Sequence, residues 1–316
     1  MGTPEFSMET LRYLYEKTDL CLVVTKEDKV NARGNKITYS PVKEFAIEHN
    51  IEYIQPKSLR KEEIYNILKK ANADLIVVAA YGKIIPKNII DLPKYGIINV
   101  HSSILPKYRG ASPIQAALLN GDKKTGLTIM MIDEGLDTGD ILDIEEIEID
   151  EKDNYETLST KLSKLAYNLL DRVINNLIKG TQKRIKQDDS KAIIVGLIKK
   201  EDCKLDWNLD NVQIYNKVRA LNPSPTAYTQ KENLHMKVYE VEKIFNEYKG
   251  QNGEVVEITK KGPVIKCNKG AIKLLKIKLD GKKIQTGSDL VNGRKVSLGD
   301  ATYQISQDIK KYTLGD

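Results

Sequence analysis

The sequence predicts an α/β protein in which a Rossmann-like, doubly wound and mostly parallel sheet is followed by a small OB-like β-barrel domain. Over residues 1–181, short apolar runs alternate with helical segments, which is the order of a parallel sheet and its crossover helices. Beyond residue 200, short strand-like runs are separated by glycine-containing turns, a pattern typical of a small closed or partly open barrel. A length of 316 residues leaves room for two such domains.

The first domain combines buried strands with capped helices. Its strands are expected where apolar runs are uninterrupted, as in parallel strands covered on both faces, at residues 21–25, 75–80, 96–100 and 127–132. Ser40 as N-cap and Pro41 at the first helical position begin one helix. A second helix is expected at residues 112–120. A long amphipathic helix covers residues 154–179, with apolar residues at steps of three and four.

The second domain contains one helix and several short strands. The helix is expected at residues 211–221, and the strands at residues 236–241, 254–258, 263–267, 272–279 and 295–298. Between the two domains, residues 182–200 are polar and charged without periodicity, so they are interpreted as a linker. The expected organisation is therefore a catalytic domain over residues 1–181, a basic linker over 182–200 and a barrel over 201–316.

Composition excludes several classes of protein. Hydrophobic residues make up 41% and charged residues 30%, which is typical of a globular protein. The longest apolar stretch, residues 75–81, is far too short for a membrane-spanning helix, and the N-terminus lacks the features of a secretory signal. The three cysteines and three histidines are scattered, so we expect neither a disulfide framework nor a metal site.

Positive charge is concentrated in the second half of the chain. Residues 182–200 hold six Lys and Arg against two Asp and Glu, and residues 201–316 hold 20 against 15. Residues 1–181 are slightly acidic, with 24 against 27. A basic second half suits a polyanionic partner, because neutralised phosphates release counterions. A solvated, lysine-rich surface explains the same charge equally well.

Two polar clusters follow predicted strands. Asn99 and His101 are two residues apart at the end of a strand, so both project from one face at the carboxyl edge of the sheet, where such folds bind ligands. Residues 133–140 follow the next strand and contain four acids and two glycines, and an acid there could orient or charge His101. Taken singly, the first cluster is also compatible with a turn-capping Asn and a buried His, and the second with a solvated turn.

Together and in order, these clusters carry a resemblance to a known family. The stretches AAYGKIIP, GIINVHSSILPKYRGASPIQAALLNG and TGLTIMMIDEGLDTGDIL closely resemble the folate-dependent formyltransferases. The segments GTPEF, ARGNK, SPVK, LDW and ALNPSP are similar to the branch that acts on methionyl initiator tRNA. The resemblance covers essentially the whole chain. It implies an enzyme that moves a formyl group from 10-formyltetrahydrofolate to the free α-amino group of methionyl initiator tRNA, for translation initiation.

The resemblance places the family's catalytic residues on Asn99, His101 and Asp137. It implies that the Asn99 amide and a protonated His101 donate hydrogen bonds to the oxygen that becomes negative during attack. Asp137 would hold the imidazole and favour its charged form. The proton lost by the amine would pass through His101, Asp137 or water. No covalent intermediate is required.

The resemblance also implies binding residues. The folate site would be lined by Ser103, Ile104, Leu105, Pro106, Tyr81 and Gly82. The tRNA would be contacted by Arg33 in a flexible basic loop and by Lys199, Lys200, Lys217 and Arg219, chosen as candidates for gripping the backbone. The expected partners are folate and initiator methionyl-tRNA, with no membrane. The chain is expected to act as a monomer in a bacterial-type cytoplasm, and an organelle remains the alternative location.

One feature departs from the family. Its members have an apolar strand that leads into the GTPEF turn, whereas here the turn begins at Gly2. We therefore expect the first strand of the sheet to be missing through a misassigned start codon or a truncation, and the neighbouring strands to be left with unpaired backbone.

Four other functions compete with tRNA formylation. A sugar-nucleotide N-formyltransferase shares the catalytic domain, but the basic barrel and the ARGNK loop disfavour it. A glycinamide ribonucleotide enzyme would lack the second domain, and a formyltetrahydrofolate hydrolase would use water as the acceptor. A truncated RNA-binding protein without activity would bind tRNA and release no tetrahydrofolate.

Overall fold

The computed structural model describes residues 1–30, 37–231 and 234–301. The chain divides into two compact units. Unit 1 comprises Met1–Pro113, Lys124–Glu148 and Ser159–Val195, and unit 2 comprises Ile114–Lys123, Ile149–Leu158 and Gly196–Asp316. Two short segments that precede residue 181 thus group with unit 2, and most of the expected linker groups with unit 1.

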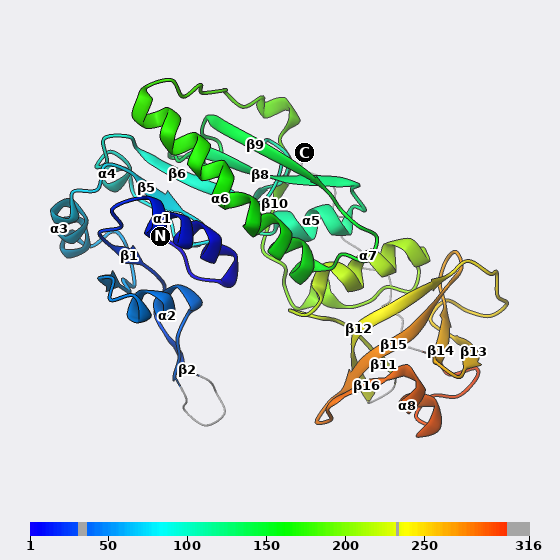
Figure 1. The fold of residues 1–316 in the computed structure, drawn as a ribbon. Helices are drawn as coiled ribbons and strands as arrows, with labels where there is room; N and C mark the ends of the chain where they lie inside the picture. The colour runs from blue at the N-terminus through cyan, green and yellow to red at the C-terminus, as the bar shows by residue number, and fades with distance from the viewer. Residues whose placement is uncertain (31–36, 232–233, 302–316) are drawn as a thin grey trace. The chain divides into compact units, whose positions relative to one another are not determined.

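A four-stranded sheet forms the centre of unit 1 (Figure 1). Its order is β5 (Ile76–Val78), β6 (Ile97–His101), β8 (Lys124–Met131) and β9 (Ile141–Glu148). β5 and β6 are parallel, whereas β8 is antiparallel to both of its neighbours. The predicted α/β class is confirmed, and the sheet is mixed in direction. Apolar periodicity reports that a strand is buried and says nothing of its direction, so the sequence could not show this.

The N-terminal residues lie between two strands. β1 (Val23–Val24) pairs in parallel with β4 (Tyr53–Ile54), and Gly2 forms an isolated parallel bridge to Ala79, just beyond β5. The Gly2 N–H donates to the Val24 carbonyl, and the Met1 carbonyl accepts from the Ala79 N–H. A cavity of about 540 Å³ lies beside this crossing and is lined by residues that include Met1, Leu22 and Val77. The β1–β4 pair and the four-stranded sheet are therefore separate at the position where the sequence led us to expect a gap, and Met1 and Gly2 bridge β1 and β5 only at one end of it.

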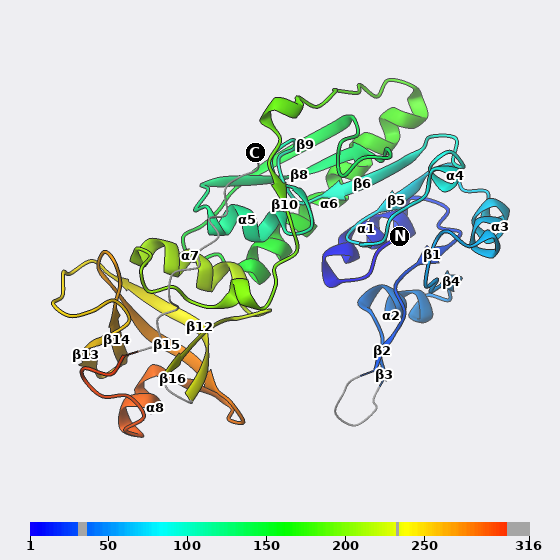
Figure 2. The same cartoon turned by 180° about the vertical axis from the view of Figure 1, so that it is seen from behind.

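Helices complete unit 1. They are α1 (Met8–Lys17), α2 (Pro41–Glu48), α3 (Glu62–Ala71), α4 (Lys87–Ile90) and, from Ser159 onward, α6 (Tyr155–Lys179). The Ser40 hydroxyl caps α2 by accepting from the Lys43 N–H, as the sequence predicted. Figures 1 and 2 show α6 along one face of the four-stranded sheet. There Arg172 donates to Asp143 and Glu145 of β9.

Residues 182–195 are attached to unit 1 along much of their length. Ile185 exchanges two backbone hydrogen bonds with Ile141 at the start of β9. β10 (Ile194–Val195) then pairs in parallel with β7 (Arg109–Gly110). The segment expected to be a linker is therefore part of unit 1 as far as Val195.

Unit 2 contains an antiparallel sheet where the sequence predicts a small β-barrel. Its strands run in the order β11 (Ala227–Lys231), β12 (Leu234–Ile244), β15 (Ala271–Leu279), β14 (Gly262–Lys266) and β13 (Val255–Thr259), and β16 (Ile284–Thr286) also pairs with β15. Helix α7 (Asn211–Leu221) packs against β12, and Trp207 is buried in the same core. In the described part of the sheet β11 and β13 are not paired, so the barrel is partly open.

One predicted strand of unit 2 is wrong. Residues 295–298 form no strand, and the chain before them forms the short helix α8 (Gly287–Asn292). Thr286 and Asp289 cap this helix reciprocally, because each side chain accepts from the other residue's backbone N–H. The sequence TGSD contains this capping signal, which competes with the weak apolar pattern that follows it. Within the described residues, no helix is long and apolar enough to cross a membrane.

Candidate functional site

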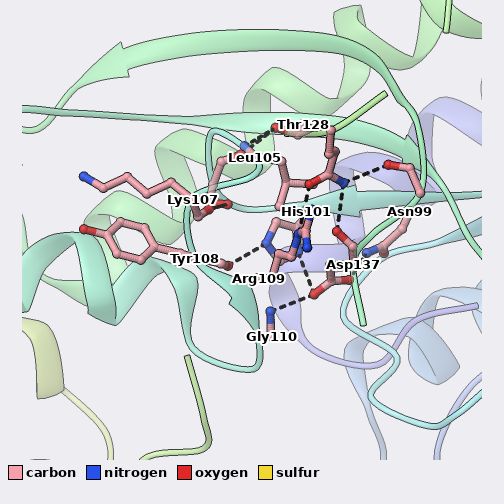
Figure 3. A network of polar contacts seen from close by, with 12 residues as sticks. Asn99, His101, Leu105, Lys107, Tyr108, Arg109, Gly110, Thr128 and Asp137 are labelled. Atoms are coloured by element: carbon pink, nitrogen blue, oxygen red, sulfur yellow. Dashed lines mark hydrogen bonds and ion pairs between the residues drawn. The ribbon is translucent and has the colours of Figure 1, made fainter. Parts of the chain in front are cut away.

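The candidate site lies at the carboxyl end of β6. Asn99 and His101 occupy alternate positions of this strand, so their side chains project toward the same side, where Figure 3 shows them close to Asp137. His101 is buried, with 5% of its surface exposed, and Asn99 is half-buried. The structure thus brings together the three residues expected to be catalytic, although Asn99 and Asp137 are 38 positions apart in the sequence.

Both ring nitrogens of His101 face protein oxygens. Nε2 lies 2.9 Å from the Tyr108 carbonyl oxygen, and Nδ1 lies 3.6 Å from Asp137 Oδ2. The carbonyl oxygen can only accept, so Nε2 carries a proton. The imidazole is therefore anchored by Tyr108 and presents its other nitrogen to a carboxylate at slightly more than hydrogen-bond length.

Asp137 is held in an unusual backbone conformation. Its φ is 53°, in the left-handed region that a non-glycine residue adopts only where its surroundings stabilise it. Oδ2 accepts from the Gly110 N–H at 2.8 Å, and Oδ1 lies 3.5 Å from the Asn99 amide nitrogen. One carboxylate oxygen is thus firmly fixed, while the other has only a weak contact.

The loop that follows β6 fixes this arrangement. Tyr108 reaches His101, and Gly110 reaches Asp137, so two residues of one short segment hold two different catalytic candidates (Figure 3). Both contacts use backbone atoms. The sequence analysis missed Tyr108 and Gly110, and the available signal was only their position inside the stretch KYRG between the two clusters.

The residues expected to bind folate fall into two groups. The side chains of Ser103 and Leu105 are buried, with 0% and 3% exposed, and face inward. The Ser103 hydroxyl donates to the Lys107 carbonyl, and Leu105 packs against Met130 and Ile141. These two side chains therefore shape the loop.

The other expected folate residues are more exposed to solvent, except Tyr81, which is buried and has a side-chain hydroxyl without a hydrogen-bond partner in the described part of the chain. Ile104 and Pro106 are half-buried and Gly82 is exposed. The Tyr81 hydroxyl is buried and finds no hydrogen-bond partner in the described part of the chain, and burial raises its pKa to about 12. A buried hydroxyl without a partner is costly, so Tyr81 is the member of this set with a donor to offer a ligand.

The residues expected to contact tRNA are also divided. Arg33 lies outside the described residues, and Lys199 and Lys200 are exposed. Lys217, by contrast, donates from Nζ to the Lys204 carbonyl, and burial lowers its pKa. The structure therefore gives Lys217 a role inside unit 2.

Arg219 has a similar internal role. Its guanidinium donates to Asn216 and to the carbonyls of Asp150, Glu151 and Asp153, so it fastens a turn of unit 2. Burial lowers its pKa. In sequence, Lys217 and Arg219 are two more basic residues on a helix, and only the fold shows that their charges are already engaged.

The structure describes the base of the loop that contains Arg33. Strands β2 (Lys29–Val30) and β3 (Ile37–Thr38) pair there. Nearby, the buried Lys43 ammonium forms a 2.6 Å ion pair with Asp28 and lies 3.9 Å from the centre of the Tyr39 ring. A buried, paired cation anchors the chain on both sides of the hairpin.

Within the described residues, no group of His, Cys, Asp and Glu side chains is arranged to hold a metal ion. The site contains an amide, an imidazole and a carboxylate at one sheet edge, with backbone atoms holding two of them. This set suits acid–base and hydrogen-bond catalysis of group transfer.

Comparisons with known proteins agree with this chemistry. Residues 5–174 match the formyl transferase family, and residues 197–295 match the C-terminal domain of formyl transferases. The chain belongs to the formyl transferase family.

Its relatives are named more narrowly. The methionyl-tRNA formyltransferase of Fusobacterium nucleatum is 43% identical over 304 residues, which cover 95% of this chain and 97% of the relative. That of Caldicellulosiruptor saccharolyticus is 44% identical over 305 residues, with the same coverage. Among solved structures, the sugar 3N-formyl transferase WlaRD aligns with a TM-score of 0.64 at 22% identity, covering 89% of this chain and 97% of that one. This last similarity concerns the fold.

Proposed function

We propose that this chain transfers the formyl group of 10-formyltetrahydrofolate to the free α-amino group of methionyl initiator tRNA. Family membership makes it an enzyme of one-carbon transfer. The observation that carries the site assignment is the meeting of Asn99, His101 and Asp137 at the carboxyl edge of β6. The nearly full-length relatives named for tRNA formylation support the acceptor and disfavour a sugar-nucleotide substrate.

In the proposed reaction, the amine nitrogen attacks the formyl carbon and negative charge develops on the formyl oxygen. Asn99 donates the hydrogen bond to this oxygen. Its amide nitrogen is free to do so, because its contact with Asp137 Oδ1 is long and weak, at 3.5 Å. The Nε2 proton of His101 is engaged by the Tyr108 carbonyl, so His101 acts through Nδ1, the nitrogen that faces Asp137. This differs from the expectation that both side chains donate hydrogen bonds.

The step balances with one proton transferred. The new C–N bond forms as the bond from the formyl carbon to N10 breaks. The attacking nitrogen loses one proton, and N10 gains one. Asp137 Oδ1 is positioned to accept the proton, because the other oxygen is fixed by the Gly110 N–H. We propose that His101 then helps return a proton to N10.

For the donor, we propose that the backbone and exposed faces of residues 103–106, with Tyr81 and Gly82, line the folate site. The unpartnered Tyr81 hydroxyl, in the part of the chain that the structure describes, supports this placement. A related protein, WlaRD, was solved in the presence of 5-N-formyl-THF, which supports folate as the donor class.

For the acceptor, we propose that unit 2 and the exposed Lys199 and Lys200 contact the RNA backbone. Lys237 of β12 and Lys278 of β15 are direct partners in the antiparallel register. Like charges placed opposite each other destabilise a sheet, and a phosphate between them would remove the repulsion. This pair is a better candidate for phosphate contact than Lys217 and Arg219.

We further propose that the enzyme acts as a monomer in the cytoplasm, where charged initiator tRNA is available.

The proposal as a whole is tested by incubating the chain with 10-formyltetrahydrofolate and methionine-charged initiator tRNA, and by measuring formyl-methionine and tetrahydrofolate together. Equal amounts of both products support it. Release of tetrahydrofolate without formyl-methionine would instead indicate hydrolysis, and RNA binding without either product would indicate an inactive binding protein.

A further inference from the structure

Residues 182–195, the part of the expected linker that belongs to unit 1, contain a single buried side chain. The structure describes all of this segment, and its other side chains are exposed or half-buried, including Lys183, Arg184 and Lys186. Gln187 is the exception, with 7% of its surface exposed. A polar residue that is buried alone in a solvated segment is held by its hydrogen bonds and not by apolar packing.

Three hydrogen bonds join the Gln187 side chain to the catalytic unit. Its amide nitrogen donates to the carbonyls of Asp137 at 2.8 Å and Gly139 at 2.7 Å. Its amide oxygen accepts from Arg109 Nε at 3.0 Å. The Arg109 guanidinium is itself buried and forms a 2.7 Å ion pair with Asp189, two residues beyond Gln187.

These contacts hold Asp137 through both its side chain and its main chain. Arg109 stands between Tyr108, which holds His101, and Gly110, which holds the Asp137 side chain. Gln187 joins this segment to the backbone of Asp137. The carboxylate is therefore fixed through its side chain by Gly110 and through its main chain by Gln187.

The main-chain contact matters because of the conformation of Asp137. A residue at φ 53° returns toward the ordinary helical or extended regions unless neighbouring contacts oppose this. Two bonds to carbonyls on either side of Thr138 resist such a rotation. A small rotation would move the carboxylate away from His101, which it approaches at only 3.6 Å.

We propose that Gln187 is a positioning residue for the formyl-transfer step, acting through Asp137. This rests on the proposed function of the site. The inference adds that residues 182–195, which the sequence led us to expect to be part of a linker, take part in building the catalytic geometry of unit 1.

The test compares three single variants. Gln187→Leu keeps the size and removes every hydrogen bond, and Gln187→Glu keeps an acceptor for Arg109 and removes the donor. Gln182→Leu is the matched control, because Gln182 lies in the same segment and also donates to two carbonyls, those of Leu142 and Lys183, outside the catalytic loop. Both Gln187 variants should lower kcat about 10- to 100-fold with KM for both substrates changed less than about threefold, since displacements near 1 Å have such effects. The Gln182 variant should keep kcat.

A double variant separates positioning from general stability. If Gln187 acts through Asp137, then Gln187→Leu should cost less than about threefold in kcat when Asp137→Asn is already present, because the two effects are not independent. An equal loss in both backgrounds, or full kcat in Gln187→Glu, would overturn the proposal.

A second measurement needs no activity. Backbone hydrogen exchange of residues 133–140 should become faster in Gln187→Leu than in Gln182→Leu. Equal exchange in the two variants would also overturn the proposal. A wild-type chain that lacks formyl transfer but shows this difference would refute the proposed function and leave the role of Gln187 on the loop intact.

Discussion

Replacing Asp137 with Asn is the most informative perturbation of the site. The amide has nearly the shape of the carboxylate, and its oxygen can still accept from the Gly110 N–H, so the loop should remain folded. The change removes the negative charge beside His101 and the oxygen proposed to take the proton. It therefore tests the charge at this position separately from the shape.

The geometry sets an upper limit on the effect. Two unit charges separated by the 3.6 Å between His101 Nδ1 and Asp137 Oδ2 interact with about 5 kcal/mol at an effective dielectric constant of about 20. This corresponds to at most about 10³–10⁴-fold in rate. Because removal of one stabilising group from a developing oxyanion usually costs about 10²–10³-fold, we expect a loss of that size in kcat.

The assay is steady-state formylation of methionyl initiator tRNA, with kcat and both KM values determined. Glu134→Gln is the matched control, because it removes the same charge from the same loop at an exposed site where its partner is Lys87. We expect this control to change kcat less than about threefold. A loss below about tenfold in Asp137→Asn with the fold intact, or a loss found only in KM, would refute the assigned role.

Two further predictions concern the rest of the chain. Removing the charges of Lys237 and Lys278 should weaken tRNA binding and make the affinity less dependent on salt concentration. Lys217→Met should instead lower the unfolding midpoint with little effect on tRNA affinity. A larger loss of tRNA affinity in Lys217→Met than in the Lys237 and Lys278 variants would contradict the assignment. Gly110→Ala should lower kcat more than about tenfold, because a Cβ at this positive-φ position would overlap a carbonyl oxygen of β10 and displace the N–H that holds the carboxylate; retained activity would show that this contact is dispensable.

Much of the fold could be predicted because local pattern determines local structure. The apolar runs and the Ser-Pro cap predicted β5, β6 and α2, and the apolar periodicity predicted α6, since burial and helix capping depend on residues close in sequence. The alternation that placed Asn99 and His101 on one side of a strand end follows from the same two-residue period. The residue types of the site could therefore be identified in the sequence, and the family resemblance indicated which reaction they catalyse.

What the tertiary structure alone decided depends on contacts between distant residues. The direction of β8, the anchoring of His101 by a carbonyl of the following loop, and the internal role of Arg219 have no local signature. Gln187 reaches the main chain of Asp137 across 50 residues of sequence. Hydrophobic pattern reports whether a residue is buried, but the partner of a buried polar atom is whichever oxygen or N–H the folded chain brings within about 3 Å.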